Sequence, residues 1–260
     1  MVKKYKEWEG KEFTSIDGYK YRIVRYVSKE FMQVRFEDGT TKEISRQSAI
    51  NQTLSKIPKK VYGIGVADYS EDSLPEVKDK WRGILRRSIQ FEKGYISNKN
   101  QKAISSYSEV TICEEWLTFS NFEKWMLTHN WEGKDLDKDL LGNGKHYSPD
   151  TCCFLPHQVN IAIQTRENTT EVLGVSAPDK RGLFRVSTYW KEVRQNSKSF
   201  RCIKQAHKYW QENKINSLLR MVDEYYTRDE ISTRVRDKLL DICCKIQEDI
   251  DLGRFTTSIV

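Results

Sequence analysis

One stretch of the chain limits its possible folds more than any other: residues 136–160, "LDKDLLGNGKHYSPDTCCFLPHQVN". The apolar–polar run "DLDKDLL" is typical of a short strand, and the loop "GNGKHYSPD" after it is rich in turn-forming residues. The run "TCCFLP" predicts a second strand that ends at Pro156, and "HQVNIAIQTR" mixes apolar and polar positions as a helix does. The order strand, loop, strand, helix predicts a compact element that either serves packing alone or holds a metal ion.

The first 60 residues predict a small β unit. The runs "GYKYRIVRYV" and "FMQVRFED" alternate apolar and polar side chains, and the pairs Asp17-Gly18 and Asp38-Gly39 are hairpin signals. We expect a barrel-like domain here, with "IPKKVYG" as the linker that follows. Its 14 basic and 8 acidic residues make it locally +6, which fits either a solvated basic face or an accessory DNA contact.

The remainder of the chain mixes helices and strands. Residues 77–91, "VKDKWRGILRRSIQF", have helical spacing of apolar side chains, "EVTICEEW" predicts a strand, and "TFSNFEKWMLTH" predicts a helix capped by Thr118 or Ser120. Farther on, "LGVSAPDKRGLFRVSTYW" predicts short strands, and residues 203–226 and 231–249 predict two long helices. We therefore expect an α+β protein with domains at residues 1–60, 61–168 and 169–260.

The composition sets limits on partners and on the compartment. Lys and Arg number 44 against 37 Asp and Glu, and the resulting charge of +7 permits an anionic partner. No apolar run has the length of a signal peptide or of a membrane span, so we expect a cytoplasmic protein. Six cysteines without CxxC spacing favour buried free thiols over disulfides or a four-cysteine zinc site.

Four blocks of the middle segment follow one another in a specific order: "YGIGVADYS", "WRGILRR", "ICEEWLTFSNFEKWM" and "WEGKDLDKDLLGNGKHYSPDTCCFLPHQVN". Together they resemble the HNH-type (ββα-metal) homing endonucleases encoded by tailed phages, over about residues 62–165. The resemblance implies a nuclease finger that cuts or nicks double-stranded DNA with one Mg²⁺ or Mn²⁺ ion. Such an ion prefers oxygen ligands and would polarise the scissile phosphate.

The resemblance also implies metal ligands. Asp137 on the first strand and Asn160 on the helix would hold the ion. Strand geometry offers a variant, because Asp137 and Asp139 would lie on one face of a continuous strand and Lys138 on the other. Asp139 would then be a second ligand, or it would position the attacking water.

The general base of the family is a histidine, and Lys138 stands at that position here. A lysine with a pKa near ~10.4 is protonated at neutral pH, and lowering the pKa by about 3 units costs roughly 4 kcal/mol. Lys138 is therefore either a phosphate contact or a base whose pKa is depressed by burial and by the metal. The other candidate bases are His146 in the loop and His157, three residues before Asn160.

Most of the positive excess lies in residues 177–220, which contain 11 basic and 3 acidic residues. The run "LGVSAPDKRGLFRVSTYW" followed by "SFRCIKQAHKYWQENK" resembles the APETALA-type DNA-binding domain, in which a three-stranded sheet enters the major groove. The resemblance implies that four basic residues contact DNA: Arg181, Arg185, Lys191 and Arg194. The alternative is a solvated charged face.

These observations lead us to expect a phage endonuclease that acts on double-stranded DNA in the host cell cytoplasm, with no membrane and no small-molecule cofactor as partner. One finger per chain suggests nicking by a monomer or a double-strand break by a homodimer. Two alternatives stay open. One is a non-catalytic DNA-binding protein, regulatory or host-inhibiting, with a degenerate finger, and the other is an RNA-binding protein.

Overall fold

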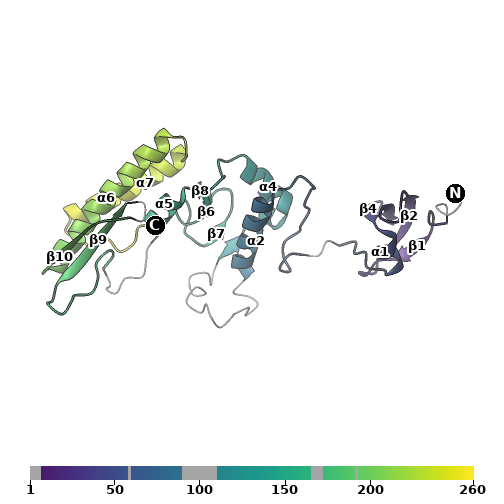
Figure 1. Ribbon diagram of the computed structural model, residues 1–260, viewed down its shortest axis with the longest axis horizontal. Helices are drawn as coiled ribbons and strands as arrows, with labels where there is room; N and C mark the ends of the chain where they lie inside the picture. Colours follow the sequence, from purple (N-terminus) through teal and green to yellow (C-terminus); the bar gives the residue numbers. More distant parts are fainter. Residues whose placement is uncertain (1–6, 58–59, 90–109, 165–171, 191–192) are drawn as a thin grey trace. The chain divides into compact units, whose positions relative to one another are not determined.

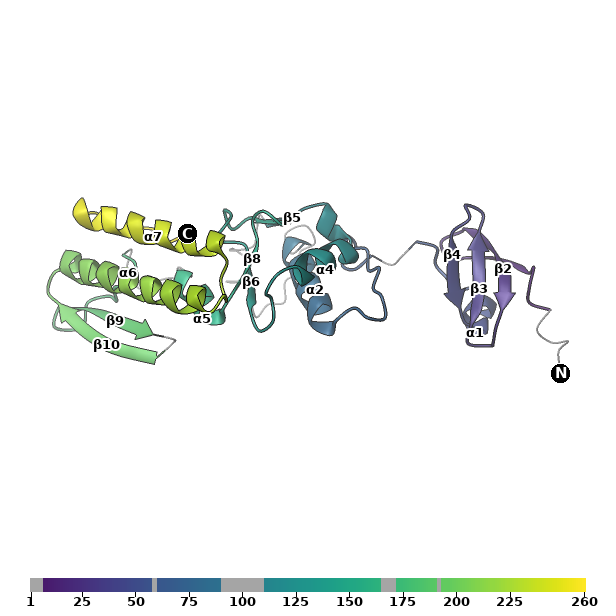
Figure 2. The same ribbon diagram turned by 90° about the horizontal axis from the view of Figure 1, so that it is seen from above.

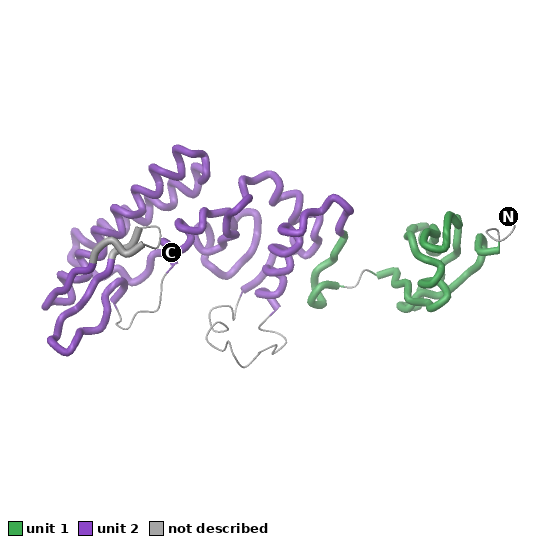
Figure 3. The backbone as a smooth tube through the Cα atoms, viewed as in Figure 1, with its two compact units in different colours: residues 1–68 green, residues 69–260 purple. Residues whose placement is uncertain are grey.

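The computed structural model describes residues 7–57, 60–89, 110–164, 172–190 and 193–260, without the side chains of residues 188–190 and 193–196. The chain forms two compact units, residues 1–68 (unit 1) and residues 69–260 (unit 2), as Figure 3 shows. The fold mixes helix (38%) and strand (19%), which confirms the expected α+β class. No helix of the described residues has both the length and the apolar character needed to cross a membrane.

Unit 1 contains one antiparallel sheet whose strands neighbour one another in chain order (Figure 2). Its elements are β1 (Glu12–Thr14), β2 (Lys20–Tyr26), β3 (Met32–Phe36), β4 (Thr41–Ile44) and the short helix α1 (Arg46–Ile50). The predicted alternation is confirmed: Tyr21, Ile23 and Val34 are buried in one cluster with Ala49 of α1. One face of the sheet is therefore apolar and covered by α1.

The expected barrel is wrong for the described residues, because this sheet is open. β1 and β4 form its two edges and are not paired with each other. Closing a barrel requires strands long enough to tilt and stagger around an axis, and here a helix covers the apolar face instead. Both predicted turns are confirmed: Gly18 and Gly39 have a φ of +87°, which glycine adopts without a Cβ clash.

Unit 2 begins with an aromatic core between two helices. The elements are α2 (Pro75–Ile89), β5 (Thr111–Ile112), the 3₁₀ helix η1 (Glu115–Leu117) and α4 (Phe119–Leu127). The predicted helices are confirmed, whereas the strand expected at "EVTICEEW" is only two residues long and gives way to η1. Trp81 of α2 and Phe119 of α4 are fully buried, with ring centroids 5.4 Å apart.

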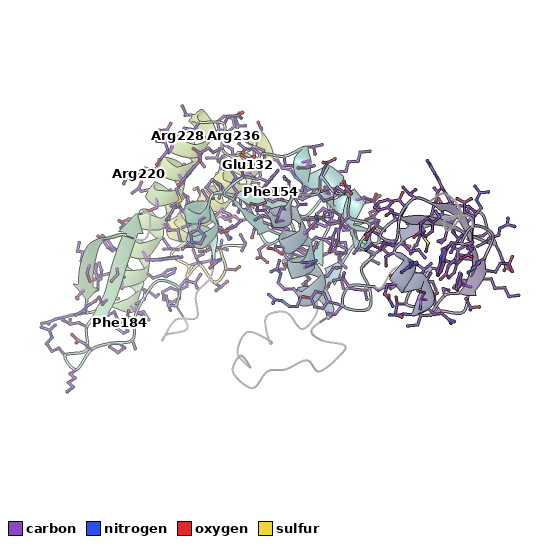
Figure 4. All side chains as sticks on the ribbon, turned by 45° about the vertical axis from the view of Figure 1, so that its right-hand side comes forward. Glu132, Phe154, Phe184, Arg220, Arg228 and Arg236 are labelled. Carbon is purple, nitrogen blue, oxygen red and sulfur yellow. The ribbon has the colours of Figure 1, made fainter. Side chains whose placement is uncertain are left out.

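The expected order strand, loop, strand, helix follows next. β6 (Asp135–Asp137) pairs antiparallel with β8 (Cys153–Leu155), and α5 (His157–Ile163) comes directly after β8. The loop between the two strands contains β7 (His146–Tyr147), which pairs in parallel with β5. We call β6, β8 and α5 the finger. Phe154 of β8 lies where the finger meets α4, with its ring 5.4 Å from that of Trp125 (Figure 4).

The last part of unit 2 is a β-hairpin followed by two long helices (Figure 1). The hairpin strands are β9 (Phe184–Trp190) and β10 (Val193–Phe200), and the helices are α6 (Ile203–Thr227) and α7 (Thr233–Asp251). Both predicted helices are confirmed, but the described residues form a two-stranded sheet where we expected three strands. Residues 173–183 make turns instead, because Gly174 and Gly182 have positive φ and Asp179 accepts the N–H groups of Arg181 and Leu183.

The finger and the two long helices share one hydrophobic cluster. Leu155 of β8 and Val159 of α5 are fully buried together with Leu218 of α6 and Leu239 of α7. The boundary that we expected at residues 168–169 lies outside the described residues. The cluster nevertheless joins side chains from both sides of it, so the finger obtains part of its core from α6 and α7.

The segment after α7 folds back onto α6 through buried polar contacts. The Thr256 N–H donates to His207 Nε2 over 2.9 Å, and Gln211 Nε2 donates to Thr256 Oγ1 over 2.9 Å. The other ring nitrogen of His207, Nδ1, lies 3.0 Å from the Leu173 carbonyl oxygen. The imidazole of His207 therefore joins three segments of the chain, and the bond from Thr256 requires Nε2 to be unprotonated.

Candidate active site on the finger

The register of the finger hairpin decides which carboxylate meets the helix. Asp135 pairs with Leu155, and Asp137 pairs with Cys153. Because Leu155 is followed by Pro156, the N-cap of α5, Asp135 lies opposite the start of the helix. Asp137 is two residues farther along β6, a distance of about 7 Å in a strand. The side chains of α5 therefore reach Asp135 rather than Asp137.

Three polar side chains meet at this point, which we call the Asp135 cluster. Asp135 Oδ2 lies 2.7 Å from His157 Nδ1 and accepts a hydrogen bond from Asn160 Nδ2 over 2.9 Å. His157 and Asn160 are three residues apart on α5, so their side chains lie on the same face of the helix. The side chains of His157 and Asp135 are 59% and 38% exposed, which leaves the cluster open to solvent.

The surroundings keep the Asp135 carboxylate ionised. Partial burial opposes ionisation, but the hydrogen bonds from Asn160 and His157 and the charges of His157 and Lys80 outweigh it, so the pKa of Asp135 lies below its usual value. Lys80 reaches this region from α2, where its Nζ donates to the Lys134 carbonyl oxygen over 2.8 Å. The cluster thus combines an anion, an imidazole and a nearby ammonium group.

Asp137, the expected metal ligand, is 4% exposed and serves the backbone turn after β6. Its Oδ1 accepts the N–H groups of Asp139 over 3.2 Å and of Leu140 over 2.8 Å. Burial raises the pKa of Asp137 to about 6, an effect that these hydrogen bonds only partly oppose. The hydrogen-bond partner of Asn160 is Asp135, so the structure does not join the two expected ligands, Asp137 and Asn160, through that amide.

Lys138 and Asp139 form a pair with each other. Lys138 Nζ lies 2.7 Å from Asp139 Oδ1, and the Lys138 side chain is only 8% exposed. The same ammonium lies 5.7 Å from the ring centroid of Tyr147, whose hydroxyl accepts from Arg87 Nε over 2.6 Å. The expectation that Asp137 and Asp139 share a strand face is wrong, because β6 ends at Asp137 and the chain turns there.

The two histidines that were candidate bases have different surroundings. His157 belongs to the Asp135 cluster. His146 lies on β7, where its Nδ1 is 2.7 Å from Thr111 Oγ1, and both side chains belong to the small sheet formed by β5 and β7. The structure therefore places only His157 beside a carboxylate of the finger.

Metal binding by the Asp135 cluster can be judged from its donor atoms. In the described ranges, no group of three or more His, Cys, Asp or Glu side chains is arranged to hold a metal. Mg²⁺ needs only one or two protein carboxylates, since water completes its shell. Asp135 and Asn160 provide a carboxylate and a carboxamide from two elements of the finger, which fits that requirement. Burial raises the pKa of Cys152, the residue before β8, to about 12, so this residue stays a thiol.

The predicted DNA contacts of the C-terminal part are only partly described. Arg181 lies in a turn and pairs with Asp179 over 3.0 Å. Arg185 is exposed on β9, and its neighbour Val186 is fully buried in the cluster beneath α6. Lys191 lies outside the described residues, and the side chain of Arg194 is not described. Among the four predicted DNA contacts, only Arg185 has a described side chain that lies on a strand and faces solvent.

Sequence reasoning missed Asp135 and Lys80. Asp135 could have been found from the hairpin register, since the first residue of β6 must oppose the last residue of β8 and so the start of α5. Lys80 could not, because it comes from a helix more than 50 residues earlier and its place depends on tertiary packing.

No protein-family model, no curated protein and no solved structure matches the chain.

Proposed function

We propose that the protein is a metal-dependent DNA endonuclease whose finger hydrolyses phosphodiester bonds at the Asp135 cluster. One observation carries the proposal: Asp135 Oδ2 is in hydrogen-bond contact with both His157 and Asn160. These side chains come from the first strand and the helix of the finger, the same two elements that the resemblance to ββα-metal nucleases implies for the site. The proposal therefore assigns the strand ligand to Asp135 in place of Asp137.

His157 is the general base in this proposal. When Nδ1–H donates to Asp135, the lone pair resides on Nε2, and the carboxylate stabilises the imidazolium that forms when Nε2 takes a proton. Nε2 accepts that proton from a water molecule, whose oxygen forms a new bond to phosphorus. The P–O bond on the opposite side breaks, and solvent protonates the leaving oxygen. A divalent cation held by Asp135 and Asn160 would supply stabilisation of the phosphate charge.

The basic surface supports DNA as the substrate. The net charge is +7, and Lys80 brings an ammonium group into the neighbourhood of the cluster. Arg185 is exposed on β9, Arg220 lies on α6, and Arg228 follows the last residue of α6, where it pairs with Glu224 over 3.0 Å (Figure 4). Phosphate contacts of this kind provide affinity and orientation without reading sequence. With one finger per chain, a monomer would nick one strand, and a homodimer would be needed to cut both.

The test is cleavage of supercoiled DNA in Mg²⁺ or Mn²⁺ by the natural chain and by Asp135→Asn, His157→Ala and Asp137→Asn variants. Loss of a general base costs about 10²- to 10⁴-fold in rate, so the His157 variant should fall in that range and the Asp135 variant should be at least as slow. Asp137→Asn keeps an acceptor for both backbone N–H groups and should still cut. Equal activity of the natural chain and the Asp135 variant would refute the assignment.

A second function is favoured by a different observation. Asp137, Lys138 and Asp139 all make contacts within their own segment: Asp137 accepts backbone N–H groups, and Lys138 pairs with Asp139. A finger that keeps these groups for folding alone would belong to a non-catalytic DNA-binding protein. Such a protein would bind DNA with an affinity that falls steeply with salt, and it would cut none in any divalent metal.

A further inference from the structure

The outer face of the unit 1 sheet carries a group of cations. The register places Arg22 of β2 directly opposite Arg35 of β3. Lys20 is on the same side of β2, and Arg25 joins it because a bulge after Ile23 adds one residue to the strand. All four cations are exposed, while the alternate positions of the same strands are buried toward α1. We call these four residues the basic face: Lys20, Arg22, Arg25 and Arg35.

The direct opposition of Arg22 and Arg35 is unfavourable for the sheet. Like charges directly opposite each other on one face destabilise a strand pair. Neither arginine forms an ion pair within the described part of the chain. The carboxylates on this side lie on the edge strands: Glu12 of β1 is directly opposite Arg22, and Glu43 of β4 is opposite Gln33. The cations therefore occupy the two central strands and the anions the two edges, an arrangement that suits a bound polyanion better than an internal salt-bridge network.

We propose that the basic face binds the phosphate backbone of duplex DNA, as a contact separate from the finger and from β9. Guanidinium groups bind phosphate through paired N–H donors. Lys20 and Arg22, two residues apart on β2, extend the cationic row by about 7 Å along the strand. The inference rests on the proposed function only in taking DNA as the polyanion.

The composition of the face favours a duplex over a single strand. Binding of single-stranded nucleic acid relies on aromatic side chains on which bases stack. The outward positions of β1 to β4 carry charged side chains, threonine and glutamine, and the aromatic Tyr21 and Phe36 point into the core. Because unit 1 is on the same chain as unit 2, each contact raises the local concentration of DNA at the other.

The test is fluorescence anisotropy of a labelled DNA duplex with the full chain in EDTA, as a function of salt. The face variant is Arg22→Gln/Arg35→Gln. The matched control is Lys29→Gln/Arg46→Gln, which removes the same charge from two exposed residues joined through the Arg46 N–H and the Lys29 carbonyl oxygen. Loss of two phosphate contacts should reduce the slope of log K against log salt by about 2. The control should leave the slope nearly unchanged.

Three results would overturn the inference. The first is an equal loss in both variants, which would show that only net charge matters, and the second is no loss in either. The third is stronger binding of single-stranded DNA or of RNA than of duplex DNA in competition. The face variant should unfold at nearly the same temperature as the natural chain, since it removes both the Arg22–Arg35 repulsion and the attraction between Arg22 and Glu12. If the face variant unfolds at a lower temperature, an Arg22→Lys/Arg35→Lys variant is measured in its place. This variant keeps both charges, so its slope of log K against log salt should equal that of the natural chain.

The same measurements separate this inference from the proposed function. If the natural chain binds through the basic face but never cuts, the endonuclease proposal fails and the basic face stands. If the natural chain cuts with Mg²⁺ and the face variant binds DNA unchanged, the inference about the basic face fails and the endonuclease proposal stands.

Discussion

Lys134 and Glu230 are joined by a hydrogen bond of 2.7 Å, in which the buried Lys134 ammonium donates to the Glu230 carbonyl oxygen. The bond ties the residue just before β6 to the turn between α6 and α7. Asn130 makes a second tie, from Nδ2 to the Asp229 carbonyl oxygen over 3.2 Å. The position of Asp135, the next residue after Lys134, therefore depends on the C-terminal helices.

Replacing Lys134 by methionine should lower the free energy of unfolding by about 1–3 kcal/mol, because the Glu230 carbonyl loses its charged donor. Urea denaturation of the natural chain and the variant measures the difference. Lys124→Met, at an exposed position of α4, is the control and should change stability by less than about 0.5 kcal/mol. Equal losses in both variants would contradict a structural role for the Lys134–Glu230 bond.

Gly174 should not tolerate alanine. It has a φ of +71°, and a Cβ at this position would overlap the indole ring of Trp210. Gly174→Ala should therefore cost about 3 kcal/mol or more, from overpacking and backbone strain together.

Gly182 is the matched control for that substitution, because it has a similar φ of +76° and no atom near the position of a Cβ. Gly182→Ala should cost only the backbone strain, about 1 kcal/mol. Urea unfolding of the two variants measures both losses in the free energy of unfolding. Equal losses would show that overlap with Trp210 does not cause the loss in Gly174→Ala.

Stability should fall in mild acid through His207. Burial lowers the pKa of His207 below 6.5, although its bond to the Leu173 carbonyl and the charge of Asp249 oppose this. The folded chain thus favours neutral imidazole, and the unfolded chain takes up a proton first as the pH decreases. The stabilisation is complete above about pH 7 and is lost as the pH falls through the lowered pKa of the folded state.

Thermal unfolding at about pH 7.5 and about pH 5 tests this expectation. The melting temperature of the natural chain should drop more over that range than that of a His207→Gln variant, whose side chain does not titrate. A drop of the same size in both would assign the acid sensitivity to other groups.

Asp137 should have the opposite pH effect. Its pKa in the folded chain is raised to about 6 by burial, so its ionised form destabilises the fold at neutral pH by up to about 3 kcal/mol. Asp137→Asn should therefore raise the free energy of unfolding at about pH 7.5, and the gain should shrink near pH 4.5, where the natural carboxyl is largely protonated. Urea titrations in EDTA at both pH values measure it, and a variant that is less stable at both would contradict the expectation.

The sequence predicted elements well where periodicity and turn chemistry act locally. The apolar spacing of residues 77–89 and of both long C-terminal helices identified α2, α6 and α7, and the Asp-Gly pairs located Gly18 and Gly39. Closure of the first sheet could not be predicted, because alternation reveals which side of a strand is buried but not whether the sheet edges meet.

The sequence predicted the strand–loop–strand–helix order of the finger but not which carboxylate lies beside the side chains of α5. Treating "DLDKDLL" as one continuous strand put Asp137 and Asp139 on a common face. The backbone turns after Asp137, and Asp137 itself accepts the N–H groups of that turn. The pairing of Thr111 with His146 was also missed, because a two-residue strand with a partner 35 positions away has no local signature.

The core shared by the finger and the long helices has a consequence for the order of folding during synthesis. Unit 1 has its own cluster, complete by Leu54, so it can fold as soon as it leaves the ribosome. The core of the finger forms later, because Leu155 and Val159 share their hydrophobic cluster with Leu239 and Ile246 of α7, more than 75 residues farther along the chain. A nascent chain thus completes the sheet of unit 1 long before the Asp135 cluster can take its final place, so the two units form in sequence during translation.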